Sequence, residues 1–250
     1  AENKTNLFVE KPFSNSLSGF ENFEKCALKN KLLFFVSYQR RFHPYLKKIK
    51  DLVTSKAIGE VISARLNVTS YLPEWHPYEN FKEMYAFRKD LGGGVLLTEI
   101  HEIDLCFWYF GLPASVYCSG GNFSGESMDV EDSIHMTLNY NKFSVSINMS
   151  FMLKPNRRDI YIGGTEGYVE WNSIGNTLTT VNHIKKNEEI LCDPDYTNDA
   201  MFISQASYFL KEFDSADKNY FEATKASLIL VAAAKKSMRQ GVEVKIENNG

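Results

Sequence analysis

The stretch NLFVEKPFS, residues 6–14, is a short apolar run that breaks into a charged pair and then a proline. Residues 7–9 are predicted to form a buried parallel strand, because strands covered on both faces have continuous apolar sequences. Such a strand delivers Lys11 to the carboxyl edge of the sheet, where α/β proteins bind ligands. A surface lysine that merely follows a strand is the alternative interpretation.

The residues after this strand complete a strand–helix–strand unit. Residues 14–30 have helical apolar spacing, with Ser14 or Ser16 as the expected N-cap. The run KLLFFVSY, residues 31–38, is predicted to be a second buried strand joined by a right-handed crossover. Two strands are too few to form a stable layer alone.

Beyond a helix that opens at Pro44, the pattern changes to short alternating strands. The strands are predicted at 60–72, 115–123, 132–140, 142–152, 158–165, 167–173 and 176–184, and further helices at 94–111, 199–213 and 221–239. Mostly adjacent strands with separate helices indicate an α+β layer, a large open, mostly antiparallel sheet with helices on one face. The other face is expected to be apolar enough to pack against a second subunit.

Composition excludes several classes of protein. The chain has 250 residues and a net charge of −3, which argues against a nucleic-acid partner. Its short basic clusters, Lys47–Lys48, Arg157–Arg158 and Lys235–Lys236, are interpreted as solvated faces. No apolar run reaches the roughly 20 residues of a membrane span. Four scattered cysteines without a CxxC pair indicate reduced thiols and a cytoplasmic location.

The segment YQRRFHP, residues 38–44, follows the second strand and so lies at the same sheet edge as Lys11. Arg40, Arg41 and His43 suit an anionic or polyhydroxyl ligand, because guanidinium groups form paired hydrogen bonds. Salt bridges at a domain junction are an equally good interpretation.

The segment FRKDLGGGVLLTEIHEID, residues 87–104, is the most informative. Three glycines before a helix allow a tight turn and the approach of a ligand to backbone N–H groups. His101 shares a helix face with apolar residues and with Asp104, which could set its tautomer and basicity. A buried structural histidine and simple turn chemistry are the alternatives.

The loop LPEWHPYENF, residues 72–81, combines Trp75, His76 and Tyr78 with two prolines. It is suited to stacking on a sugar ring, or equally to capping the edge of the sheet. His135 and His183 lie in predicted strands and are interpreted as structural. The histidines are too dispersed to indicate a metal site.

Together these segments resemble the glucose–fructose oxidoreductase/inositol dehydrogenase family, often written Gfo/Idh/MocA. The matching pieces occur in the family's order: VEKP at 9–12, YQRRFHP at 38–44, AIGEV at 57–61, GGGVLLTEIHEIDL at 92–105, GGTEGYVEW at 163–171, and the tail ASLILVAAAKKSMRQGVEV. The set covers nearly the whole chain.

The resemblance implies a two-domain NAD- or NADP-dependent oxidoreductase of sugars, sugar derivatives or cyclitols. It implies that Lys11 contacts substrate and nicotinamide ribose, and that His101 is the acid/base. The cofactor side of the site is assigned to Glu10, Lys11, Pro12 and Arg40, and the substrate side to Arg41, His76, Arg88 and Asp104. It also implies a homodimer or homotetramer formed through the open sheet.

Two departures from the family pattern matter. The family often has Asp four residues before the helix histidine, where this chain has Leu97, so that Thr98, Glu99 or Asp104 would have to take its role. The chain also contains no G-x-G-x-x-G dinucleotide loop. Residues 1–55 are therefore interpreted as the C-terminal remnant of a Rossmann domain, loosely held or paired with another chain.

Residues 56–250 are interpreted as the substrate-binding and oligomerisation domain, and the helix 221–239 can pack back on the first domain. On this interpretation the chain alone is inactive and does not bind the cofactor tightly. The alternative is a non-catalytic sugar-binding or assembly module that has kept the fold without the cofactor site.

Overall fold

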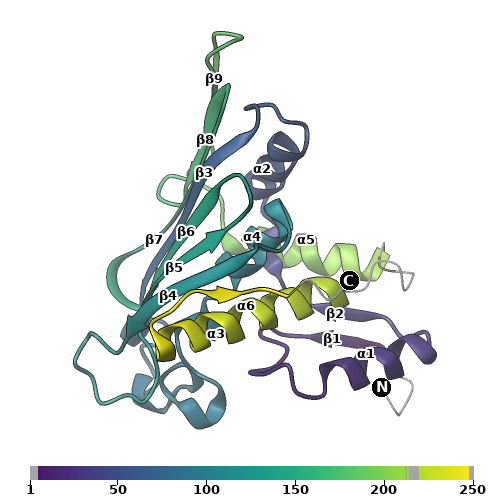
Figure 1. Cartoon of the computed structure of the whole chain (residues 1–250), viewed down its shortest axis with the longest axis vertical. Helices are drawn as coiled ribbons and strands as arrows, with labels where there is room; N and C mark the ends of the chain where they lie inside the picture. Colours follow the sequence, from purple (N-terminus) through teal and green to yellow (C-terminus); the bar gives the residue numbers. More distant parts are fainter. Residues whose placement is uncertain (1–4, 212, 214–219, 248–250) are drawn as a thin grey trace.

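The computed structural model describes residues 5–211, 213 and 220–247. These residues form a small two-stranded sheet and a nine-stranded sheet, each with its own helices (Figure 1). The sequence prediction of an α/β segment followed by a large, mostly antiparallel sheet is confirmed.

The small sheet contains β1 (Leu7–Val9) and β2 (Phe34–Val36), which pair in parallel with Leu7 opposite Phe34. The crossover helix α1 (Phe20–Lys29) starts later than its apolar spacing suggested. The residue before it, Gly19, has a positive φ of 77° and no side chain to cap with. The predicted cap at Ser14 or Ser16 is therefore wrong.

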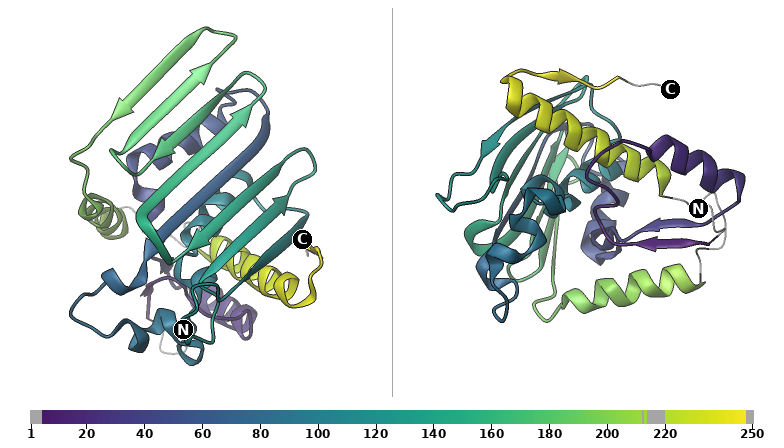
Figure 2. Two further views of the ribbon diagram at one scale, coloured as in Figure 1. Left: turned by 90° about the vertical axis from the view of Figure 1, so that its left-hand side faces the viewer. Right: turned by 90° about the horizontal axis from the view of Figure 1, so that it is seen from below.

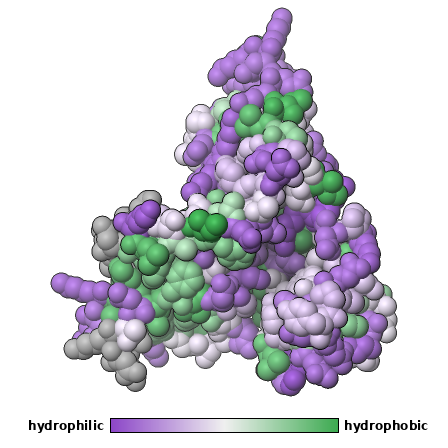
Figure 3. All heavy atoms as spheres, turned by 180° about the vertical axis from the view of Figure 1, so that it is seen from behind, coloured by the Kyte–Doolittle hydropathy of each residue, from purple (hydrophilic) through white to green (hydrophobic). Residues whose placement is uncertain are grey.

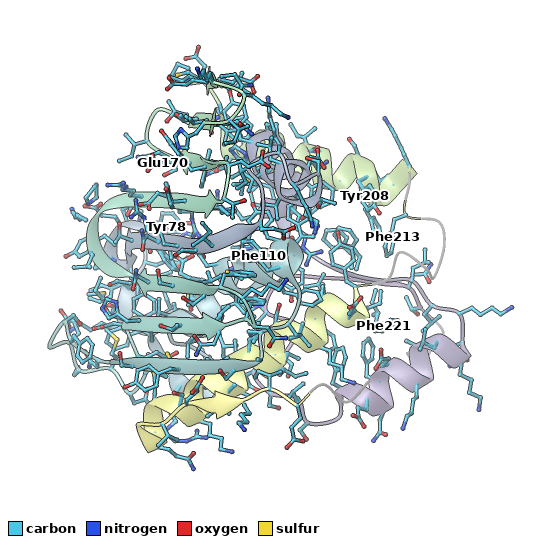
Figure 4. The ribbon with its side chains drawn as sticks, turned by 45° about the horizontal axis from the view of Figure 1, so that its top comes forward. Tyr78, Phe110, Glu170, Tyr208, Phe213 and Phe221 are labelled. Atoms are coloured by element: carbon cyan, nitrogen blue, oxygen red, sulfur yellow. The ribbon has the colours of Figure 1, made fainter. Side chains whose placement is uncertain are left out.

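Helices from the far end of the chain cover both faces of this small sheet (Figures 2 and 4). Phe209 of α5 (Asn198–Lys211) packs edge-on against Phe8, with ring centroids 4.9 Å apart. On the opposite face, Phe221 of α6 (Phe221–Gln240) stacks on Phe34 at 4.9 Å. Because side chains alternate across a strand, the two helices bury successive residues of β2. Residue 212 of the predicted helix 199–213 lies outside the described residues.

The outer side of α5 keeps apolar side chains exposed. Hydrophobic residues gather over this part of the molecule in Figure 3, and the exposed ones include Phe8, Phe202, Ile203 and Leu210. The neighbouring strand β1 pairs only with β2, so its other edge carries no strand in the described part of the chain. An unpaired strand edge beside apolar residues is a surface that proteins usually cover.

The large sheet has the strand order β10-β9-β8-β7-β3-β6-β5-β4-β11. Only β3 and β6 run parallel to each other, and the other neighbouring pairs are antiparallel. The strands are β3 (Val61–Tyr71), β4 (Ser115–Gly121), β5 (Ser133–Asn139), β6 (Ser144–Ser150), β7 (Met152–Gly164), β8 (Gly167–Asn172), β9 (Thr177–Asn182), β10 (Asn187–Cys192) and β11 (Val244–Lys245). The strand β10 was not predicted, because its sequence NEEILC is polar and pairs only with β9.

Helices cover one face of the large sheet, which carries the main core (Figure 2). The covering helices include α2 (Pro44–Thr54), α4 (His101–Phe110) and α6, and short 3-10 turns, η1 (Gln39–Phe42), η2 (Leu72–Glu74), η3 (Phe81–Glu83), η4 (Tyr85–Phe87) and η5 (Lys89–Leu91), form the connections. α6 also contacts β4 and α4, so that it joins the two sheets.

The opposite face of the sheet is polar, contrary to the expected apolar surface. A row of hydrogen bonds crosses four strands, from His135 through Asn148 and Asn67 to Asp159, with lengths of 2.6, 2.7 and 2.7 Å. Alternation places these residues outward and residues such as Leu66 inward. Apolar burial alone therefore gives no reason for a second subunit to cover this face.

His43 caps α2, since its Nδ1 accepts the Tyr45 N–H at 3.2 Å. Burial, followed by the charge of Arg40, lowers the pKa of His43 to about 4. A depressed folded-state pKa stabilises the fold above the ordinary histidine pKa, and this stabilisation is lost as the pH falls from about 6.5 to 4. We expect a loss of about 3 kcal/mol over this interval, measured by urea unfolding at a series of pH values.

The variant His43→Asn keeps a capping side chain without a titrating group. It should flatten the dependence of unfolding free energy on pH between 6.5 and 4. The control His183→Asn replaces an exposed histidine and should change the free energy of unfolding at pH 7 by less than about 0.5 kcal/mol. If His43→Asn loses as much unfolding free energy between pH 6.5 and 4 as the parent, His43 is not the group responsible for that loss.

Candidate active site

The glycine run 92–94 admits another part of the chain, not a ligand. A Cβ on Gly94 would lie 2.4 Å from the Glu131 carboxylate, and Gly94 has a φ of 100°. Glu131 accepts the Leu96 N–H at 3.3 Å, and its backbone oxygen accepts the Val95 N–H at 2.9 Å. Gly94 is therefore a turn residue that permits the close approach of Glu131, which agrees with the alternative interpretation of the glycine run.

The predicted helix 94–111 is broken into α3 (Val95–Thr98) and α4. The break falls at Glu99, whose backbone φ of −102° and ψ of 33° leave the helical region. In an unbroken helix the Thr98 carbonyl would accept the N–H of Glu102, but that N–H points to the Glu99 carbonyl at 3.4 Å. The freed Thr98 oxygen instead accepts a hydrogen bond of 2.6 Å from Lys11 Nζ.

Glu99 and Glu102 flank the break and both pair with Arg158 of β7. Both glutamates are buried and 15% of the Arg158 side chain is exposed, and Ser70 of β3 donates a further hydrogen bond of 3.1 Å to Glu99. Burial alone would raise the pKa of Glu99, but Arg158 and Lys11 hold it below its ordinary value. Burial raises the pKa of Glu102 in spite of its bond to Arg158.

His101 begins α4 within this charged cluster and is 3% exposed. Its Nδ1 is buried and has no hydrogen-bond partner. Burial, and after it the positive charges of Lys11 and Arg158, hold the pKa of His101 well below its ordinary value. The imidazole is therefore neutral at neutral pH and able to accept a proton.

Lys11 lies partly buried beside these residues. Burial lowers its pKa, although the carboxylate of Glu99 opposes this shift. Lys11 thus combines an ammonium group within 2.6 Å of the helix break with a reduced cost of giving up its proton.

The two neighbouring arginines have separate environments. Arg40 lies among Glu99, Glu102 and Arg158, whereas Arg41 forms a bidentate pair with Asp104 at 2.8 and 2.7 Å. Asp104 therefore does not orient His101, as the sequence had suggested. The Arg41–Asp104 pair fits the salt-bridge alternative better than a substrate contact.

The other two predicted substrate residues lie in exposed loops. The ring of His76 bonds the Tyr78 hydroxyl at 2.9 Å, and Arg88 pairs with Asp90 two residues away. In the described part of the chain, neither has a hydrogen bond or ion pair to Lys11, Glu99 or His101. The structure therefore does not bring them to the cluster.

Arg158 is the residue that sequence reasoning missed. The Arg157–Arg158 doublet was interpreted as a solvated face, but only Arg157 fits this description, with a half-exposed side chain paired to Asp159. An arginine at an inward position of an alternating strand was the available signal, because such a charge needs a buried partner.

The structure also bears on metal binding, disulfide formation and membrane insertion. No group of three or more potential metal ligands occurs among the described residues. All four cysteines are free thiols. None of the helices in the described segments is both long and apolar enough to span a membrane.

The model of the GFO/IDH/MocA C-terminal domain matches residues 46–170. The chain belongs to this family. The oxidoreductase YteT of Bacillus subtilis is 28% identical over 123 residues, which are 48% of this chain and 28% of YteT. The myo-inositol 2-dehydrogenase of Thermotoga maritima is 23% identical over an alignment of 265 residues, gaps included. The alignment covers 99% of this chain and 74% of that enzyme.

A solved structure of levoglucosan dehydrogenase, in complex with NADH and levoglucosan, superposes with a TM-score of 0.82 at 16% identity. The match covers 99% of this chain and 75% of that one. At this identity the likeness establishes the fold alone. The aligned segments thus range from about a quarter to three quarters of the relatives' lengths.

Proposed function

We propose that this chain supplies the substrate domain of an NAD(P)-dependent oxidoreductase that acts on a hydroxyl or carbonyl group of a sugar, sugar derivative or cyclitol. The observation that carries the proposal is the cluster of Lys11 with the buried Glu99 and His101 at the helix break. The names of the inositol and levoglucosan dehydrogenases in the same family support the substrate class.

In the oxidation direction, the neutral imidazole of His101 accepts the proton of the substrate hydroxyl. The Lys11 ammonium donates a hydrogen bond to the same oxygen and stabilises the charge that develops on it. Glu99, held by Arg158 and Ser70, keeps a negative charge beside Lys11 and so favours its protonated form. In the reverse direction His101 returns the proton to the carbonyl oxygen.

The nicotinamide cofactor, NAD or NADP, would accept or supply the hydride. Lys11 follows the carboxyl end of β1, where ligands of parallel sheets lie, and this supports the assignment of Glu10, Lys11 and Pro12 to the nicotinamide end. The free edge of β1 and the apolar residues of α5 beside it suit the packing of further strands of a dinucleotide-binding domain.

A cytoplasmic location and assembly into a homodimer or homotetramer through the open sheet are part of the same proposal. The hydrogen-bonded row from His135 to Asp159 would make such an interface polar. Leu97, which stands where the resembled family often has Asp, favours a second candidate, a sugar-binding or assembly module without catalysis.

The test measures NADH or NADPH formation by the intact protein that carries this chain, with a panel of cyclitols and sugars. Saturable turnover with at least one of them is expected. Titration calorimetry of the 250-residue chain with NADH and NADPH is expected to show no tight binding. Sugar binding with no turnover by the intact protein would establish the non-catalytic candidate instead.

A further inference from the structure

A cavity of about 450 Å³ adjoins the candidate active site and has an unusual lining. Glu99 and Ser70 of the cluster form part of its wall, as do Trp75 and Trp171. Its volume lies within the range of about 300–1,000 Å³ that is common for small-molecule sites. The cavity therefore reaches the candidate active site at Glu99 and Ser70, although Lys11 and His101 are not among the residues that line it.

Three polar atoms on the wall of this cavity are buried without a hydrogen-bond partner: Arg40 Nε, Asn176 Nδ2 and Tyr196 Oη. Asn176 Oδ1 accepts the Trp171 indole N–H at 2.9 Å, and the Asn176 side chain also interacts with His43. Two of the three atoms are donors only, and a hydroxyl can donate as well. Buried donors without acceptors cost free energy unless a ligand satisfies them.

The charged residues that line the cavity also favour a ligand with hydrogen-bond acceptors and a negative charge. The cavity is lined by three arginines and one glutamate, and Arg158 is already paired with both Glu99 and Glu102. Arg157 pairs with Asp159. Arg40 is left without a carboxylate of its own, and burial lowers its pKa to about 10. In the surroundings of the cavity, the cations Lys11, Arg40 and Arg158 lie near the carboxylates of Glu99 and Glu102, and Glu10 also lies near Lys11.

We propose that this cavity selects a substrate with a carboxylate group, a sugar acid in place of a neutral sugar, and that Arg40 binds that carboxylate. The inference rests on the proposed function and specifies the substrate class of the same site. A carboxylate offers acceptors to Arg40 Nε–H and the Asn176 amide. The partly exposed indole of Trp75 suits the carbon skeleton of the sugar.

An anion beside Arg40 has a further effect on the cluster. The positive charge of Arg40 is one of those that disfavour protonation of His101. A bound carboxylate offsets this charge and raises the proton affinity of the imidazole when substrate is present. Arg40 is therefore assigned to the substrate, not to the cofactor as the sequence had suggested.

The test is titration calorimetry of the intact protein with matched pairs, D-glucuronate against D-glucose and D-galacturonate against D-galactose, with glucose 6-phosphate as a second anion. In at least one pair, the acid is expected to bind ten-fold or more tightly than its neutral partner. Arg40→Gln should abolish this preference, and Tyr196→Phe, which removes only a hydroxyl, should reduce it several-fold. Arg65→Gln, an exposed arginine of the open sheet face, is the control and should retain it.

Equal affinity for acid and neutral sugar in both pairs would overturn the inference, as would a preference that survives in Arg40→Gln. Tighter binding of glucose 6-phosphate than of either sugar acid would overturn the carboxylate assignment. NADH formation from neutral sugars alone would refute this inference and leave the proposed function intact. Absence of turnover with every sugar would instead count against the proposed function.

Discussion

Replacement of His101 by asparagine in the intact protein is expected to lower turnover by about 10²–10⁴-fold, the usual contribution of a general acid/base. The imidazole is neutral, buried, and has an unpartnered Nδ1 beside Lys11. Asparagine is polar and smaller but cannot accept the hydroxyl proton at neutral pH. The measurement is kcat and kcat/KM for NADH formation, with the same substrate for variant and parent.

His76→Asn is the matched control, since His76 lies in an exposed loop and bonds only Tyr78 among the described residues. It should leave kcat within about two-fold of the parent. Lys11→Met should reduce kcat as well, because it removes the hydrogen bond to the developing oxyanion. Turnover of His101→Asn within ten-fold of the parent would contradict the assignment of His101 as the base.

The pH dependence of kcat/KM gives an independent check. Only the unprotonated imidazole acts as a base, and burial keeps the pKa of His101 below its ordinary 6.5. The rate of hydroxyl oxidation should therefore hold from neutral pH to below 6.5 before it falls. A fall in kcat/KM centred above pH 6.5 would mean that a group other than His101, or a different protonation state of the residues around it, controls the reaction.

The sequence allowed the positions of Lys11 and His101 to be predicted, because each follows a recognisable local feature. Lys11 follows a buried strand, and His101 follows a glycine run that opens helical spacing. The break at Glu99 could not be read from the sequence, since VLLTEIHEID has no glycine or proline to interrupt its helical propensity. Tertiary contacts outweigh this propensity: Lys11 takes the Thr98 carbonyl, and Arg158 takes the two glutamates.

The sequence also did not reveal which charged side chains pair with one another. Asp104 lies three residues after His101, and helical spacing alone suggested that the two interact. A new helix begins at His101 after the break. The Asp104 carboxylate accepts hydrogen bonds from Arg41, which lies 63 positions away in the sequence. Arg40 and Arg41 are adjacent and chemically alike, and only the packing of η1 directs them to different clusters.

Asp104→Asn is expected to destabilise the fold by about 3–5 kcal/mol, because it leaves a buried arginine without its counter-ion. The Asp104 side chain is fully buried, and 14% of the Arg41 side chain is exposed. Burial alone would lower the pKa of Arg41, but the Asp104 carboxylate raises it above its ordinary value. The guanidinium also lies over the rings of Tyr38, Trp108 and Tyr220, at 5.5 to 5.6 Å from their centroids.

Urea unfolding at pH 7 measures the loss, and the exposed pair Lys48–Glu189 is the control. The two side chains of that pair are 34% and 50% exposed, so Glu189→Gln should cost less than about 1 kcal/mol. A similarly small cost for Asp104→Asn would show that water reaches the Arg41 pair.

The double variant Arg41→Met/Asp104→Leu separates a structural pair from a substrate contact. Removing both charges together leaves no unpaired ion, and apolar replacements of buried ion pairs are often neutral or more stable. Stability should therefore return to near the parent value, with a coupling energy of about 3 kcal/mol in the double-mutant cycle. Because Arg41 and Asp104 lie outside the Lys11–His101 cluster, the double variant should also keep its turnover, whereas a loss of turnover with restored stability would return both residues to the substrate site.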